Sequence, residues 1–256
     1  MEFNRDAMLQ KYADLRSRYV EPYEPDFSHE HDTVRYVKIP DVSSAANLYS
    51  RSVLRHFEAK RALFPRQYKN LPKGANPAEY DAMYFAPDGN LHLAVYTGLP
   101  DGELICVNVS EQLVLTYRIQ EQPGRKPFVT FLSMEWTEYD ADSNPVSVEE
   151  FRRNGSLADG VLINSEYYQY ADGRMVHAER YAAFDSDDSG NPLLLRFVPD
   201  RIYNPEMFSY DFRRTEDGVL CQRTNYWSRS KTYTASILLP EKELLKLEKN
   251  GLSCFM

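Results

Sequence analysis

The fold is decided by the stretch Tyr167-Tyr168-Gln169-Tyr170-Ala171-Asp172-Gly173-Arg174-Met175-Val176-His177-Ala178-Glu179-Arg180-Tyr181. Two tyrosine-rich runs flank an Asp-Gly pair, which favours a type I′ turn because both central residues of that turn need positive φ. The pair Asp217-Gly218 stands in the same way between residues 208–212 and 219–226. We therefore predict two antiparallel hairpins with turns of this type.

Short apolar runs continue this pattern over about residues 82–238. They are separated by turn pairs at Asp88-Gly89, Asp101-Gly102 and Pro123-Gly124. Tight turns join antiparallel neighbours, so the expected product is a meander.

Helical spacing of apolar residues predicts helices over residues 5–20 and about 43–64, and a short helix over 241–250. The fold class is therefore α+β: a large twisted antiparallel β-meander sheet with N-terminal helices and a short C-terminal helix. Residues 1–80 are expected to form a helical segment packed on the sheet. Residues 81–256 are expected to form the β part, within one structural domain.

Composition indicates a globular protein, because 43% of the 256 residues are hydrophobic and 27% are charged. The three cysteines, Cys106, Cys221 and Cys254, are far apart and form no CxxC motif. Such spacing is typical of small core residues in a reducing compartment. Since no apolar leader and no apolar stretch of membrane-spanning length occurs, we expect a cytoplasmic protein that contacts no membrane.

Charge is distributed unevenly along the chain. The net charge is −8, but residues 51–73 hold seven basic residues and one acidic residue, about +6, which leaves about −14 for the rest. Arg51 and Arg55 of this stretch are candidates for binding an acidic group. The acidic remainder would repel a polyanion and so disfavours nucleic acid as a partner. A solvated helix face explains the same residues.

A repeated pattern follows the hairpins. It is found in Tyr139-Asp140-Ala141-Asp142-Ser143-Asn144-Pro145 and again in residues 184–192: an aromatic residue, Asp-x-Asp, then Asn-Pro before an apolar strand. Together with the hairpins around Asp172 and Asp217, residues 135–227 resemble the tyrosine–aspartate hairpin repeats of RHS-type bacterial proteins. The resemblance implies stacked hairpins, a bacterial origin and toxin-associated biology.

Two segments could hold a metal ion. In residues 185–190, Asp185, Asp187 and Ser189 alternate before a glycine, as in calcium loops, although Arg196 stands where such loops need a glutamate. A long polar hairpin loop explains the same residues and is the interpretation that we favour, because Asp, Ser, Gly and Asn are the usual turn formers. His29 and His31, in a segment expected to be a solvated acidic loop between Pro25 and Pro40, could share a metal with a distant third ligand. No other cofactor is predicted.

No G-x-S-x-G, Walker A or G-x-G-x-x-G motif occurs. Alternation places aromatic residues on one face of each strand, either toward the core or toward a protein partner; the candidate binding residues are Tyr168, Tyr170, Tyr210 and Phe212.

We expect a non-catalytic bacterial protein that binds a protein partner, in its most specific form a toxin-neutralising immunity protein. The alternative is an enzyme or small-ligand binder with a pocket on the concave face of the sheet.

Overall fold

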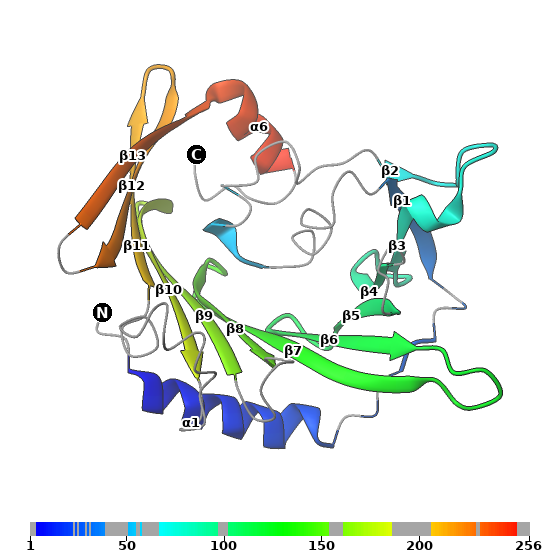
Figure 1. Ribbon diagram of the computed structural model, residues 1–256. Coiled ribbons are helices and arrows are strands. Elements are labelled where there is room, and N and C mark those ends of the chain that lie inside the picture. The colour runs from blue at the N-terminus through cyan, green and yellow to red at the C-terminus, as the bar shows by residue number, and fades with distance from the viewer. Residues whose placement is uncertain are drawn as a thin grey trace. The chain divides into compact units, whose positions relative to one another are not determined.

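The computed structural model describes residues 4–22, 24, 26–28, 30, 32–38, 51–54, 57, 67–96, 102–153, 161–185, 206–228 and 231–249. Within these residues, thirteen strands form one antiparallel sheet in the order β13-β12-β11-β10-β9-β8-β7-β6-β5-β4-β3-β1-β2 (Figure 1). From β3 to β13 every strand lies next to its neighbour in sequence. The predicted antiparallel meander is confirmed.

The strands are mostly long in the second half of the chain and shorter in the first. Their bounds are β1 Thr33–Lys38, β2 Gln67–Tyr68, β3 Tyr80–Phe85, β4 Leu91–Tyr96, β5 Glu103–Asn108, β6 Leu113–Gln120, β7 Phe128–Tyr139, β8 Pro145–Arg153, β9 Val161–Ala171, β10 Arg174–Asp185, β11 Glu206–Thr215, β12 Gly218–Ser228 and β13 Lys231–Pro240.

Helices lie near both ends of the chain. The N-terminal helix α1 spans Arg5–Leu15 and continues into a π-helical turn, η1, over Arg16–Val20. Its start is capped by Asn4, whose Oδ1 accepts a hydrogen bond from the Ala7 amide at 3.1 Å. The C-terminal helix α6 spans Glu241–Lys249, as predicted. Most of the helix predicted over residues 43–64 lies outside the described residues.

Two strands were not predicted. β1 lies in the segment expected to be a solvated loop, so that prediction is wrong for Thr33–Lys38. Its register is set by β3, where Val37 pairs with Asp81, and Val37 is 2% exposed. β2 is a two-residue strand on the other side of β1. Both pairings join segments distant in sequence, which local spacing does not reveal.

The two predicted hairpin turns differ in kind. Asp172 has φ 53° and Gly173 has φ 74°, which confirms the type I′ turn between β9 and β10. At the second hairpin, Glu216 and Asp217 form the turn and Gly218 already pairs with Thr215, so the type I′ prediction is wrong there.

Gly218 is required by the close approach of the neighbouring strand rather than by the turn. Its φ is 139°, and a Cβ at this position would lie 2.0 Å from the backbone oxygen of Leu239 in β13. The neighbouring strand therefore approaches too closely for any side chain.

The chain divides into two compact units, each described by itself below. The C-terminal unit comprises Met1–Leu9 and Thr137–Met256, and the N-terminal unit comprises Gln10–Trp136. The boundary thus passes through α1 and near the end of β7.

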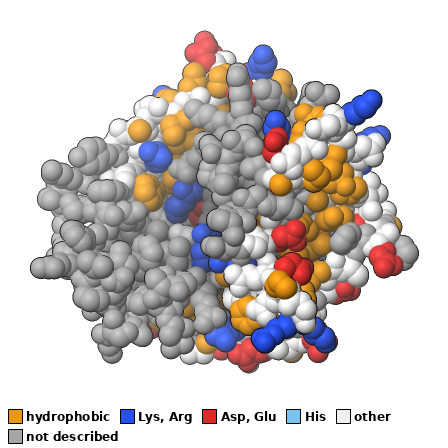
Figure 2. Space-filling view, turned by 45° about the vertical axis from the view of Figure 1, so that its right-hand side comes forward, with side chains coloured by type: hydrophobic (Ala, Val, Ile, Leu, Met, Phe, Trp, Pro, Cys, Tyr) orange, Lys and Arg blue, Asp and Glu red, His pale blue; other side chains and the backbone are white. Residues whose placement is uncertain are grey.

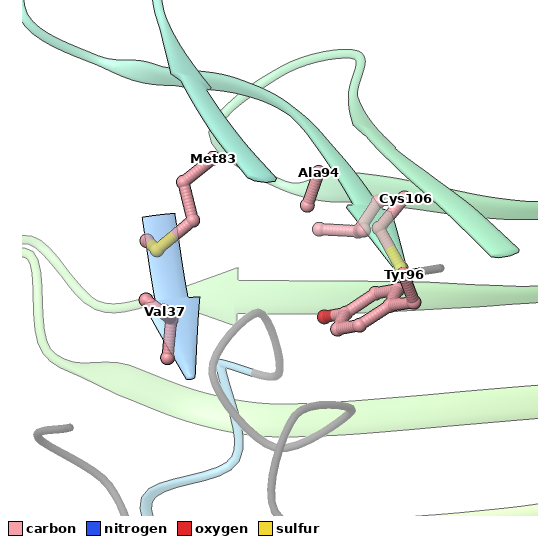
Figure 3. Packing of buried hydrophobic residues seen from close by; sticks show 6 residues of the cluster. Val37, Met83, Ala94, Tyr96 and Cys106 are labelled. Carbon is pink, nitrogen blue, oxygen red and sulfur yellow. The ribbon is translucent and has the colours of Figure 1, made fainter. Parts of the chain in front are cut away.

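Each unit has its own buried side chains. In the N-terminal unit, residues from β1, β3, β4, β5 and β6 pack together on one face of the sheet (Figure 3): Val37, Met83, Ala94, Tyr96, Cys106 and Val114. In the C-terminal unit, Phe151, Ile163 and Cys221 are all 0% exposed.

Two of the three thiols occupy the positions predicted for them. Cys106 and Cys221 are buried, one in each unit, and Cys254 lies outside the described residues.

Among the described residues, no helix has both the length and the apolar character that crossing a bilayer requires.

The crowding at Gly218 yields a test of the hairpin. We expect Gly218→Ala to lower the free energy of unfolding by about 3 kcal/mol or more, because its methyl group would collide with the β13 backbone. The matched control is Gly124→Ala, where φ is 70° and nothing lies within 4 Å of the added Cβ. It should cost only roughly 1–2 kcal/mol of backbone strain. Urea denaturation measures both; equal losses would contradict the explanation.

Candidate functional site

The four aromatic residues predicted to bind a partner lie on one face of the C-terminal unit: Tyr168, Tyr170, Tyr210 and Phe212. Tyr168 and Tyr210 both pair with Ala178, which places them on the same side of the sheet. We call this side the tyrosine face. Tyr168 is 5% exposed and Tyr210 0%. Their burial favours the core-facing alternative over a partner-facing aromatic surface.

A buried ion pair crosses the tyrosine face. Glu166 is 3% exposed, and its Oε1 accepts a hydrogen bond from Arg180 Nε at 2.9 Å. Its Oε2 accepts one from the hydroxyl of Tyr168. The Arg180 guanidinium also lies 5.7 Å from the centre of the Tyr210 ring and donates to the Tyr210 hydroxyl at 3.3 Å.

A second carboxylate stands beside this pair. Glu150, 7% exposed, accepts hydrogen bonds from Arg152 Nη2 at 2.7 Å and from Asn164 Nδ2 at 3.2 Å. Each buried carboxylate on this face thus has a cation and a neutral donor from its own sheet. Such compensation is what burying a charge requires, and it indicates a structural role.

The opposite face of β9 and β10 carries two tyrosines with shifted acidity. Burial, followed by the nearby charge of Glu149, raises the pKa of Tyr167 to about 12. Burial and a hydrogen bond from the hydroxyl of Tyr181 to Glu179, 2.9 Å long, raise the pKa of Tyr181. The two rings meet edge to face at 6.0 Å. Both hydroxyls therefore stay protonated at neutral pH, as donors rather than nucleophiles.

The same side of the sheet becomes solvent-exposed on β11, β12 and β13. Direct register aligns Asp211, Gln222 and Ser236 in one row across the three strands, and all three are exposed. Two large side chains share this surface: Tyr226 is 45% exposed and Leu238 is 44% exposed. We call these residues, with Arg213 and Thr234, the open patch. It presents one acid and one base, with all other side chains uncharged.

The predicted basic site is held in place within the N-terminal unit. The Arg51 amide donates to Glu135 Oε1 at 2.6 Å, and its Nη2 donates to the Ser110 carbonyl at 2.7 Å and to Asn108 Oδ1 at 3.3 Å. Arg51 thus ties its segment to β5, the following turn and β7. Arg55 lies outside the described residues.

The side chains predicted to bind a metal ion in residues 185–190 lie outside the described part of the chain. Asp185 is the last residue of β10, and its side chain, like Asp187 and Ser189, lies outside the described part. In the N-terminal unit, Asp32 Oδ2 lies 2.8 Å from His92 Nδ1. Among the described residues, no group of three or more His, Cys, Asp or Glu side chains could hold a metal ion.

Sequence reasoning missed the open patch as a candidate site. Its signal was present, because Gln222, Thr224 and Tyr226 alternate with residues of the other face in a strand that was predicted. Figure 2, which brings the right-hand side of Figure 1 forward, shows hydrophobic side chains at the surface beside acidic ones.

No family model, curated protein or solved structure matches this chain.

The buried ion pair can be tested against a surface pair. Arg180→Met leaves the Glu166 carboxylate buried without its cation, and we expect it to lower the free energy of unfolding by about 3–5 kcal/mol. Arg214→Met removes a surface partner of Glu241, where the two side chains are 40% and 47% exposed, and should cost under about 1 kcal/mol. Chemical denaturation measures the free energy of unfolding of both variants. Similar losses would refute the structural role of the buried pair of Glu166 and Arg180.

The raised pKa of Tyr167 predicts that the protein loses stability at alkaline pH. The ordinary tyrosine pKa of 10.0 applies when the chain is unfolded, whereas the folded value is about 12. The unfolded chain therefore loses this proton first, and stability falls as pH rises through that window. We expect Tyr167→Phe to weaken this pH dependence in denaturation measured from pH 10 to 12. Tyr226→Phe, at an exposed position, should leave it unchanged; the opposite ranking would contradict the assignment.

Proposed function

We propose that this chain is a non-catalytic protein-binding protein that engages its partner through the open patch on β11, β12 and β13. The observation that carries the proposal is the exposure of Tyr226 and Leu238 on a regular sheet face. Recognition surfaces combine such apolar anchors with neighbouring hydrogen-bonding groups, which Gln222, Ser236 and Thr234 supply.

The extent of the patch supports a protein partner rather than a small molecule. Tyr226 pairs with Thr232 and Leu238 pairs with Leu220, so the two anchors are six residues apart along the strands. At the usual rise of a strand this is about 20 Å. Anchors this far apart suit a folded partner, because a small ligand would reach only one of them.

The specific form of the proposal is an immunity protein that neutralises a bacterial toxin. The RHS-like pattern of residues 135–227 and the net charge of −8, which would attract a basic partner, support it. The alternative is an enzyme or small-ligand binder with a pocket on the concave face of the sheet. It has less support, because the buried carboxylates of the tyrosine face, Glu150 and Glu166, are already hydrogen-bonded within the sheet.

A differential binding experiment tests the proposal. The tagged full chain and its Tyr226→Asp variant are used to capture proteins from a lysate of the native host. The matched control is Val129→Asp, because Val129 is 40% exposed and lies on β7 in the other unit. We expect a protein retained by the wild type to be lost with Tyr226→Asp and kept with Val129→Asp. Equal retention by all three proteins would refute the open patch as the binding surface.

A further inference from the structure

The two edges of the sheet are built differently. At one edge, β2 has only two residues, Gln67 and Tyr68, and is followed by the exposed Lys69. Short strands and lysines are devices by which proteins prevent an edge from pairing with another chain. That edge is therefore protected.

The other edge is long, and its strand has a lysine and a proline only at its two ends. β13 has ten residues and, within the described part of the chain, pairs only with β12 (Figure 1). From Thr232 to Leu239 it contains no charged residue and no proline, and Thr234, Ala235 and Ser236 at its centre are all exposed. A long uncharged edge strand exposes a row of backbone amide and carbonyl groups that can pair with another strand.

We propose that this edge binds a second copy of the same chain by antiparallel pairing of the two β13 strands, which makes the protein a twofold-symmetric dimer. The proposal goes beyond the protein-binding function above and does not rest on it. A twofold axis at the centre of the strand would give both copies the same contacts, as closed dimers require. The small uncharged residues at that centre allow two copies to approach without like-charge repulsion.

The distribution of charge along the strand selects the chain itself as the occupant. Lys231 is the first residue of β13, and Glu241 directly follows its last residue. Antiparallel pairing brings the beginning of one strand beside the end of the other. A basic and an acidic residue of different copies would therefore lie beside each other at both ends, with a neutral stretch between them. Within its own copy Glu241 also accepts a hydrogen bond from Arg214 Nη2 at 2.7 Å, but its side chain is 47% exposed and so can face a second cation. The charges at the ends of β13 are therefore complementary to those of a second copy that runs in the opposite direction.

A matched pair of variants distinguishes the edge from the face. Ser236 in β13 and Gln222 in β12 are direct cross-strand partners, uncharged and exposed on the same face. Ser236→Lys places two lysines close to the proposed axis, whereas Gln222→Lys places its charge one strand further away. Sedimentation equilibrium of the full chain should show a dimer for the wild type and Gln222→Lys. We expect Ser236→Lys to raise the dimer dissociation constant at least about tenfold.

Three results would overturn the proposal: a monomeric wild type, a Ser236→Lys variant that dimerises as well as the wild type, or equal weakening by the two lysines. Circular dichroism establishes that each variant is folded, and Ser236→Glu replaces Ser236→Lys if the latter unfolds. The readout is independent of the protein-binding proposal. Tyr226→Asp should lose the captured partner while remaining dimeric, so failure of one proposal does not imply failure of the other.

Discussion

The cross-strand register of β9, β10 and β11 is the constraint on which the C-terminal unit depends. It opposes Glu166 to Arg180 and places Tyr168 and Tyr210 on either side of Ala178. Because side chains alternate between faces, a shift of one residue would turn the ion pair outward and bury the polar residues of the other face. The type I′ turn at Asp172 and Gly173 holds this register locally, and the buried ion pair penalises any alternative, since a misplaced charge would lose its partner.

The local part of the fold was predictable and the long-range part was not. The hairpin over residues 167–181 follows from alternation and from one turn whose residues need positive φ. β1 escaped prediction because its pairing with β3 joins segments far apart in sequence, although Thr33–Lys38 itself contains the strand-favouring residues Val34, Tyr36 and Val37. Gly218 shows the same limit within a predicted hairpin. Its position was evident, but the reason for a glycine is the backbone of β13 beside it, and only the assembled sheet reveals that approach.

For the candidate site, the sequence predicts only which side chains share a face of their strand. The sequence places Tyr168, Tyr210 and Phe212 on one side of their strands and Gln169 and Asp211 on the other, as the structure confirms. Which side is covered depends on the elements that pack there, and no spacing rule contains that information. These three aromatic residues are buried, whereas the exposed large side chains, Tyr226 and Leu238, lie on the opposite face. Arg51 likewise has internal partners that only folding brings together.

The two buried thiols have a practical consequence. Cys106 is 9% exposed in β5 and Cys221 is 0% exposed in β12, and they belong to different compact units. An alkylating reagent reaches such a sulfur only when the surrounding structure opens. The rate at which each cysteine is modified therefore reports the opening of its own unit, and mass spectrometry of the modified peptides would time the two units separately within a single sample.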